Sequence, residues 1–453
     1  MNNGNTNSGN THAGVDLGTR IPPKVLWVCW ALVWAVVACG EEASTSSADQ
    51  QGDTDALMDT GSGDLDMGAD DSESTPDGAG ADIGPQPDTD GEVGEEVRCV
   101  SGGEALPHPL VLPHDAPNGH YDPSLERDPS TGRLWLAYST VDGLAGVGRI
   151  STHLAYSDDD GRQWCDAGVV NLSDEVLLEA LPMGVDGVSA HWSHEVSELV
   201  YDPGASEDAR WLLVWHRYLH VDDGVPNTDD RQFAYGWIAA RRAADPMALA
   251  EAPEVKLFSA AAYHADPEVE AYNEAAPGGS PEQRWTTGPM APCIVFTEPG
   301  AIAVNATLYI ALLCARSPSP RSLELVALNR DDGVWDHRSM LVEPNTVVPG
   351  LDDPYNGFNG PDMVLDEQGR PRLLAVPVRS GNGSYGGCVA FDLDLETGTA
   401  SDPIVVAEPG GGAGIFQSGP CTYAPGSRLG VITGDVYLQG VQFRLHATGR
   451  VLE

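Results

Sequence analysis

Five segments of the chain repeat one pattern: a polar or acidic start, an apolar run, a turn at Gly, Asp or Asn, and a second apolar run. The segments begin at Tyr121, Ser197, Thr297, Gly360 and Gly419. Their runs are short and rich in Val, Leu, Trp and Tyr, which is typical of β-strands bounded by turns. Helical periodicity is scarce after residue 98, so the sequence predicts an all-β domain over 98–453.

This repetition favours a five-bladed β-propeller, in which each repeat forms a small sheet and radial packing protects the sheet edges. A β-sandwich or two separate β domains would also contain short strands, but neither predicts five similar segments. The last segment offers only three strands. We therefore expect the run ALPHPLVLP (105–113) to supply the missing strand and close the ring.

The amino-terminal residues have the layout of a bacterial secretion signal, with two basic residues before an apolar run at 25–38 that is short for a membrane span. The end of this run, VVAC followed by Gly40, resembles the lipobox of bacterial lipoproteins. The resemblance implies removal of residues 1–38 as a signal peptide and acylation of Cys39. An ordinary signal peptide cleaved nearby is the alternative. Because Gly40 gives no inner-membrane retention signal, we expect anchoring in the outer membrane of the cell envelope.

An acidic linker follows over residues 39–97. Residues 40–97 contain 18 Asp or Glu and no Lys or Arg. Such a stretch buries too little apolar surface to offset the entropy of ordering, so we predict a disordered, extended tether. Calcium binding by this run is the alternative, but the strict spacing of calcium loops is missing.

The propeller domain is itself acidic, with 49 Asp or Glu and 22 Lys or Arg. A surface this negative argues against nucleic acid as a partner, because such binding depends on Lys and Arg neutralising phosphates.

Six cysteines fall in this domain, and an even number in an exported chain favours disulfides over metal ligands. No Cys-x-x-Cys pair is present. Although fifteen pairings are possible, pairing each cysteine with its neighbour gives the bonds Cys99–Cys165, Cys293–Cys314 and Cys388–Cys421.

The stretch SDDDGRQW (157–164) could be a calcium loop, a catalytic cluster or a structural turn. It resembles the Asp-box of sialidase-like propellers, Ser-x-Asp-x-Gly-x-x-Trp, with Ser157, Asp159, Gly161 and Trp164 at the four defining positions. The resemblance implies a hairpin turn on the outer strands of a blade, facing away from the ligand. It therefore argues against Asp159 as a catalyst.

Acidic residues at the start of the repeated segments are the candidates for chemistry, because the innermost strand of every blade faces the central funnel. They are Asp122, Glu195, Glu198, Glu298 and Asp362. Two carboxyl groups from different blades could cleave a glycoside: one protonates the leaving oxygen and the other activates water, at a separation of about 6.5–9.5 Å for inversion.

The segments HYDPSL and RLWLAYS resemble the first blade of the five-bladed family 43 glycosidases, the arabinanases and xylosidases. The resemblance implies Asp122 as the general base, and TEPGAI places Glu298 as the general acid. The family's second blade has an Asp that tunes the acid, whereas HEVSELVYDP offers Glu195 or Glu198.

A second resemblance, to sialidases, directs attention to the arginines that end three second strands, Arg217, Arg316 and Arg379. Bidentate guanidinium contacts suit a substrate carboxylate. However, the usual Arg-Ile-Pro of the first sialidase blade is replaced by Tyr121-Asp122-Pro123. Capping of strands or pairing with acidic side chains is the alternative role of these arginines.

Histidines and tryptophans cluster in the second repeat, where His194 could orient a carboxylate or bind a metal and Trp192 could stack on a sugar. Packing between blades is the alternative for both. The sequence identifies no metal-ligating residue, and a Ca²⁺ ion at the propeller axis is left open.

The sequence thus predicts a lipid-anchored, extracytoplasmic, monomeric propeller that acts on a glycan or cell-surface polysaccharide, with an inverting glycoside hydrolase as the leading hypothesis. A non-catalytic carbohydrate- or protein-binding propeller is the alternative, and a sialidase-like exo-glycosidase comes third. The candidate substrate-binding residues are Arg217, Arg316, Arg379, Trp192, His194 and Asp362.

Overall fold

A computed structural model describes the propeller domain: residues 97–103, 105–142, 149–177, 180–182, 189–222, 231–316, 321–351, 355–379, 385–408, 415–437 and 442–453. The predicted signal peptide, Cys39 and the tether up to residue 96 lie outside the described residues. Within the described part of the chain, no helix is both long enough and apolar enough to cross a membrane.

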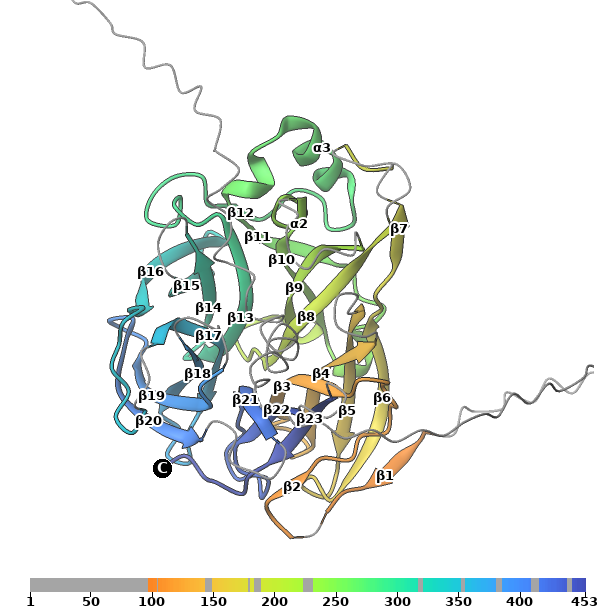
Figure 1. Ribbon diagram of the computed structural model, residues 1–453, viewed down its shortest axis with the longest axis vertical. Helices are drawn as coiled ribbons and strands as arrows, with labels where there is room; N and C mark the ends of the chain where they lie inside the picture. Colours follow the sequence, from red (N-terminus) through yellow and green to blue (C-terminus); the bar gives the residue numbers. More distant parts are fainter. Residues whose placement is uncertain are drawn as a thin grey trace, which may run out of the picture. The chain divides into compact units, whose positions relative to one another are not determined.

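The described strands form five sheets, which are the five predicted blades (Figure 1). Blade one contains, from the centre outward, β3 (His120–Arg127), β4 (Leu134–Asp142), β5 (Arg149–Ser157), β6 (Gln163–Asn171) and β1 (Cys99–Ser101). Blade two contains β8 (Ser189–Tyr201), β9 (Trp211–Asp222), β10 (Trp237–Ala243), β11 (Val255–Ser259) and β12 (Gln283–Arg284), with β7 (Glu175–Leu177) on the other side of β8.

The remaining blades have four strands each. Blade three is β13 (Val295–Val304), β14 (Thr307–Ala315), β15 (Ser322–Asn329) and β16 (Val334–Val342). Blade four is β17 (Tyr355–Leu365), β18 (Pro371–Arg379), β19 (Cys388–Asp394) and β20 (Thr399–Ala407). Blade five is β21 (Ile415–Thr422), β22 (Ile432–Tyr437), β23 (Gln442–Ala447) and β2 (His108–Pro109).

Helices are few and short among the described residues. Blade two carries α2 (Arg231–Ala234) and α3 (Pro267–Ala275), together with the 3-10 turns η3 (Glu207–Ala209), η4 (Pro246–Ala248) and η5 (Ala261–His264). Pro267 at the first position of α3 and the Asp266 side chain, which accepts hydrogen bonds from two backbone N–H groups, explain why this helix begins there.

Each interface between neighbouring blades has its own apolar cluster. Blades one and two meet around Trp135 and Trp215, and blades five and one meet around Leu134 and Leu445. Corresponding clusters fill the other three interfaces. Side chains on both faces of the inner strands are therefore buried, which explains the continuous apolar runs of the repeats.

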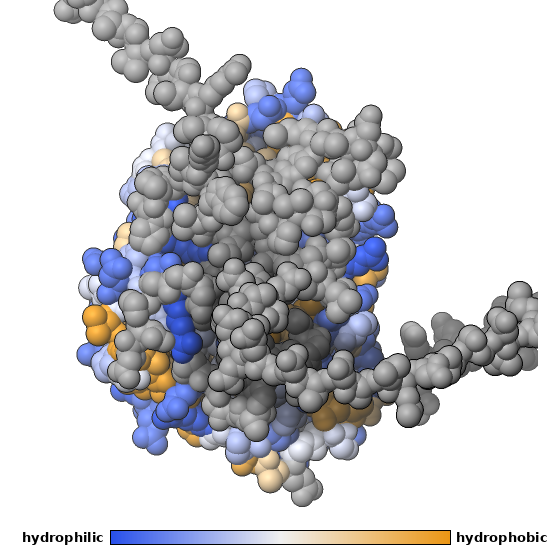
Figure 2. All heavy atoms as spheres, in the orientation of Figure 1, coloured by the Kyte–Doolittle hydropathy of each residue, from blue (hydrophilic) through white to orange (hydrophobic). Residues whose placement is uncertain are grey.

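Large apolar side chains are exposed at several places on the described part of the surface. In the view of Figure 2, hydrophilic side chains lie beside hydrophobic ones, which gather most plainly at the lower left. The most exposed large apolar residues, Val347, Leu172 and Val97, lie outside the strands in three different segments.

Ring closure follows the sequence prediction. β2, from the run 105–113, pairs with β23 and completes blade five. The Leu110 N–H extends this contact by donating to the Leu445 carbonyl at 2.8 Å. The amino-terminal end of the domain thus supplies the outermost strand of the last blade.

All three predicted disulfides are present. Cys99–Cys165 joins β1 to β6, and Cys388–Cys421 joins blade four to blade five. Cys293–Cys314 connects the segment before β13 to β14.

SDDDGRQW forms the turn between β5 and β6. Ser157 Oγ accepts from the Gly161 N–H at 2.8 Å and donates to Asp159 Oδ1, which also accepts from the Gln163 N–H at 2.8 Å. Gly161 has a φ of 83°, a conformation that glycine adopts without steric cost, and Trp164 is fully buried. The carboxylate of Asp159 is thus bound within its own turn.

Leu112→Ala is expected to lower the free energy of unfolding by about 2–5 kcal/mol, because Leu112 packs between blades five and one. Urea denaturation would measure this loss. The matched control is Val111→Ala, which truncates a neighbouring side chain that is 49% exposed and should change stability by less than about 0.5 kcal/mol. Equal losses in the two variants would contradict the packing of this closing segment.

Candidate active site

The innermost strand of every blade carries a β-bulge at the same place. Tyr121 pairs with Ser139 and Ser124 pairs with Ala137, so a step of three residues along β3 matches a step of two residues along β4. The same irregularity recurs in β8, β13, β17 and β21. Two residues on the inner strand therefore stand opposite one on its neighbour. Bulges redirect side chains out of the regular alternation of a strand.

Four of these bulges begin with a residue in the left-handed region. The φ angles are 46° for Asp122, 50° for Val196, 48° for Glu298 and 47° for Gly360. This conformation is uncommon for residues other than glycine and is a true outlier for a β-branched one such as Val196. Backbone strain of this kind clusters at functional sites. Asp122 and Glu298 hence occupy equivalent positions, and in blade two Glu195 comes one residue before that position.

Three carboxyl groups from three blades interact there: Asp122, Glu195 and Glu298, which we call the carboxyl cluster. Asp122 is 4% exposed, and the two glutamates are half-buried. Asp122 accepts hydrogen bonds from Ser139 Oγ at 2.9 Å and from the Val196 backbone.

Burial dominates the electrostatics of the carboxyl cluster. It raises the pKa of Asp122 to about 7, against the hydrogen bond from Ser139 and with a further contribution from the charge of Glu298. Burial, followed by the charges of Asp122 and Glu298, raises the pKa of Glu195 well above its usual range. At least one proton is therefore shared among these groups near neutral pH.

Glu298 has a different set of partners. Asn359 Nδ2 donates to Oε1 at 2.7 Å, and the Gly360 backbone N–H donates to Oε2 at 2.5 Å. Burial raises the pKa of Glu298, while the Gly360 N–H, the Arg321 guanidinium and the Asn359 amide act in the opposite direction. These contacts connect blade three to blade four.

Glu198 and Asp362, the residues that follow the bulges of β8 and β17, form a second pair. Ser124 Oγ donates to Glu198 Oε1 at 3.0 Å and accepts from the Leu199 N–H at 2.9 Å. Burial raises the pKa of Asp362 to about 7 and, together with the charge of Asp362, raises that of Glu198 well above its usual range. The structure thus groups Glu195, rather than Glu198, with Asp122 and Glu298.

Several polar residues around the carboxyl cluster were not among the candidates that the sequence offered. Asn359 comes directly before the bulge of β17, as Glu195 does before the bulge of β8. Alignment of the repeated segments together with the residues that precede them could therefore have found Asn359. Arg321 and Tyr385 precede the third strands of blades three and four, outside the repeated segments, and no sequence signal marks them. Asp435 on β22 is 2% exposed, and burial raises its pKa to about 6.

The candidate substrate-binding residues of blade two lie in packing contacts. Arg217 pairs with Glu254 at 2.7 Å and stacks over Trp192, which is buried between blades one and two. His194 Nδ1 accepts from Trp215 Nε1 at 3.0 Å, and burial followed by the charge of Arg217 lowers its pKa well below the usual range.

The other candidate arginines belong to blades three and four. Arg316 follows β14 and pairs with Glu324 at 2.5 Å. Arg379 ends β18, where it stands opposite Tyr355. The structure therefore does not bring Arg217 and Arg316 together as unpaired guanidinium groups around one anion.

Within the described residues, no group of three or more His, Cys, Asp or Glu side chains is arranged to hold a metal ion. The Ca²⁺ expected as a possible ion at the propeller axis thus has no such group of side chains among the described residues.

Three residues outside the bulges, Ser259, His264 and Glu270, are hydrogen-bonded in the sequence serine, histidine, carboxylate that a catalytic triad has. Ser259 Oγ lies 2.8 Å from His264 Nε2, and His264 Nδ1 lies 2.9 Å from Glu270 Oε1. A nucleophilic serine must reach its substrate, yet Ser259 is fully buried. This network instead ties β11 to η5 and α3.

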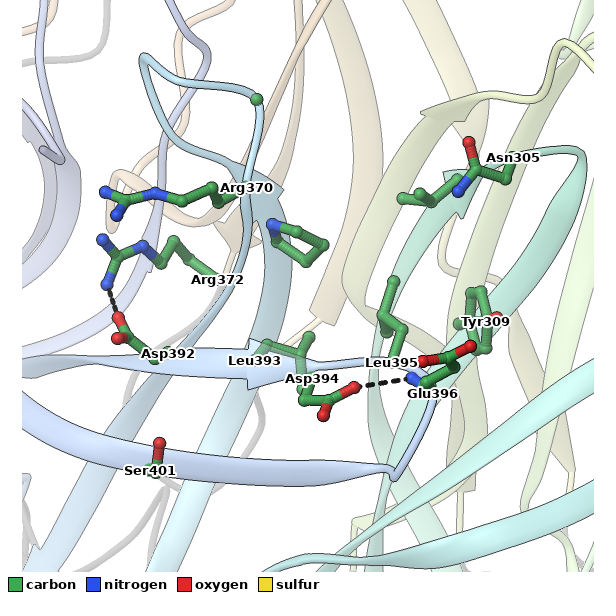
Figure 3. Close-up of a pocket in the computed structure, with 13 residues that line it drawn as sticks. Asn305, Tyr309, Arg370, Arg372, Asp392, Leu393, Asp394, Leu395, Glu396 and Ser401 are labelled. Carbon is green, nitrogen blue, oxygen red and sulfur yellow. Dashed lines mark hydrogen bonds and ion pairs between the residues drawn. The ribbon is translucent and has the colours of Figure 1, made fainter.

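A groove of about 670 Å³ lies between blades three and four, next to the β13–β14, β17–β18 and β19–β20 turns (Figure 3). The β13–β14 and β17–β18 turns follow the ends of innermost strands, several residues beyond the bulges of β13 and β17. Arg372 in this groove is bound to Asp392 and Asp366, and Arg370 to Asp366. The groove is thus remote from the carboxyl cluster, and its arginines are already paired.

The fold and the cluster define a five-bladed β-propeller with carboxyl groups from three blades at the bulges of its inner strands. No protein-family model and no curated protein sequence matches the chain.

Solved structures with some similarity include the GH43 endo-arabinanase from Bacillus licheniformis, which is 14% identical and has a TM-score of 0.35 over 62% of this chain and 77% of that one. A thermostable family-43 glycoside hydrolase is 13% identical, with a TM-score of 0.41 over 72% and 88% of the two chains. The GH32 β-fructofuranosidase from Bombyx mori is 12% identical, with a TM-score of 0.40 over 75% and 61%. Sequence identities and TM-scores this low assign no role to any residue of this chain. The five-bladed fold is established by the sheets of the chain itself.

The raised pKa values of Asp122 and Asp362 predict that the contribution of these two carboxyl groups to stability falls as the pH rises. A carboxyl group whose pKa is higher in the folded than in the unfolded state contributes stability that is complete below the unfolded pKa and is lost as the pH rises through the folded one. For Asp122 and Asp362 the loss should extend from about pH 4 to about pH 7.

Asp362→Asn should therefore reduce the difference in unfolding free energy between pH 5 and pH 8, by an amount on the order of a few kcal/mol. Denaturant titration at the two pH values would measure it. Asp336→Asn, which changes an exposed carboxyl group on β16, is the control and should leave the difference unaltered. An unaltered difference in Asp362→Asn would refute the assignment.

Proposed function

We propose that this protein hydrolyses glycosidic bonds with inversion of configuration at the carboxyl cluster of Asp122, Glu195 and Glu298. The observation that carries the proposal is the convergence of carboxyl groups from three blades, whose pKa values are raised by burial and, for Asp122 and Glu195, also by neighbouring carboxylates. Glycoside hydrolysis requires one carboxyl group that holds a proton and one that takes a proton near the working pH.

Asp122 suits the role of general base. A base acts best when its pKa is near the working pH, and burial raises the pKa of Asp122 to about 7. The Ser139 hydroxyl and the Val196 backbone hold its carboxylate in place. In this proposal Asp122 removes a proton from the attacking water, and a glutamate of the cluster protonates the leaving oxygen. The sequence resemblance assigns that second role to Glu298, with Glu195 or Glu198 as the residue that tunes it.

A purely carbohydrate- or protein-binding propeller is the alternative. It would have no need for carboxyl groups that keep protons near neutral pH, and this favours hydrolysis. A sialidase-like activity is less well supported, because Arg217 and Arg316 are already paired with Glu254 and Glu324.

We also propose that the lipid on Cys39 anchors the chain to the outer membrane and that the linker 39–97 holds a monomeric propeller off the lipid surface. A surface polysaccharide or another envelope glycan would then be within reach. The lipobox-like sequence VVAC and the absence of basic residues from 40–97 support this proposal.

Asp122→Asn is expected to lower kcat/KM by about 10²–10⁴-fold, since it removes the general base. Aryl arabinosides, xylosides and sialosides would serve as substrates, and NMR of the first product would report the anomeric configuration. The control Asp158→Asn alters an exposed carboxyl group of blade one and should leave activity unchanged. No turnover by the wild type on any glycoside would favour the binding module, and retention of configuration would exclude inversion.

Cys39→Ser should abolish incorporation of a labelled fatty acid and release the protein from the membrane fraction of a bacterial host. Cys29→Ser, within the apolar run of the signal, is the matched control and should keep both properties. Undiminished labelling of Cys39→Ser would exclude this anchor.

A further inference from the structure

The two oxygens of Glu298 both receive N–H donors. The Gly360 N–H belongs to the backbone of β17 and cannot turn away, and Asn359 Nδ2 approaches the other oxygen. An N–H group donates and cannot accept a hydrogen bond, so a proton on Glu298 would find no acceptor in these two groups and would weaken the contact at the oxygen that carries it. The hydrogen-bond donors around Glu298 therefore favour its carboxylate form, against the burial that raises its pKa.

The orientation of the Asn359 amide is fixed from its other side. Arg321 Nη1 donates to Asn359 Oδ1 at 3.4 Å, and arginine has no acceptor. The amide must therefore present its oxygen to Arg321 and its NH₂ group to Glu298. The positive charge of Arg321 also acts on Glu298 directly and opposes the rise in pKa that burial causes.

Glu195 has surroundings of the opposite kind. Its side-chain partner is the Tyr218 hydroxyl, which can accept a hydrogen bond from a protonated carboxyl group as well as donate one to a carboxylate. The main charges acting on it are the carboxyl groups of Asp122 and Glu298, both of which disfavour a third negative charge.

From these contacts we propose that Glu195 is the proton donor to the leaving group and that Glu298 is the fixed carboxylate that keeps Glu195 protonated. This assignment rests on the proposed hydrolysis at the carboxyl cluster, and it reverses the roles that the family resemblance implies. The base Asp122 and the acid Glu195 then come from the neighbouring blades one and two. The backbone N–H of Val196, the residue after Glu195, donates a hydrogen bond to Asp122.

The proposed step balances without a further reactant. The water oxygen bonds to the anomeric carbon, the glycosidic C–O bond breaks, and its electron pair stays on the leaving oxygen, which takes the proton of Glu195. Asp122 takes a proton from the water. After product release, Asp122 loses this proton to solvent and Glu195 regains one.

The activity test compares Glu195→Gln with Glu298→Gln on dinitrophenyl and phenyl glycosides of the sugar that the wild type hydrolyses. A dinitrophenolate leaves without protonation, so Glu195→Gln should stay within about tenfold of the wild type on that substrate and lose about 10²–10⁴-fold on the phenyl glycoside. Its kcat/KM should also lose the decline at high pH that reports the acid. Glu298→Gln should affect both substrates alike and move that decline to lower pH. Selective loss on the phenyl glycoside in Glu298→Gln would overturn the assignment.

A second measurement does not depend on turnover. The infrared band of protonated carboxyl groups at pH 6 should weaken in Glu195→Gln and persist in Glu298→Gln. Weakening in Glu298→Gln alone would overturn the assignment. If the band behaves as expected while no glycoside is hydrolysed, the protonation of Glu195 stands and the proposed hydrolysis fails. Arg321→Gln, outside the carboxyl cluster, provides a milder variant: loss of its positive charge should raise the pKa of Glu298 in the same infrared titration.

Discussion

The pairing of β2 with β23 is the contact on which the rest of the structure depends. A propeller brings its inner strands to one axis only when the last blade is complete and packs against the first. The closing segment also contributes Leu110 and Leu112 to the cluster between blades five and one. Without this closure, the carboxyl groups of blades one, two and three would have no fixed geometry.

The bulges convert that closed ring into a site. A regular inner strand would alternate its side chains between the two neighbouring blades, whereas the extra residue interrupts this alternation. The cost is local strain at Asp122, Val196 and Glu298, all of which have positive φ angles. Burial of three carboxyl groups adds an electrostatic cost, which shared protons and the N–H donors to Glu298 reduce.

Much of the fold could be predicted, and less of the site. Repetition, the even cysteine number and the incomplete last segment led to the propeller, the three disulfides and the closing strand, all of which are present. The choice between Glu195 and Glu198 stayed open, because the bulge between them changes the strand register and is not visible in composition. Arg217 looked like a substrate ligand, but its partner Glu254 follows 37 residues later in a segment with no repeated pattern.

The sequence by itself determined which residues could carry chemistry and that they belong to separate blades, because strand patterns and turn residues are local properties of the chain. Only the tertiary structure decided which carboxyl groups meet and which partners each one has. Asn359 and Arg321 act on Glu298 from segments that follow it in the chain, and such contacts exist only once the blades pack around a common axis. Protonation depends on burial and on neighbouring charges, and both are properties of the folded ring.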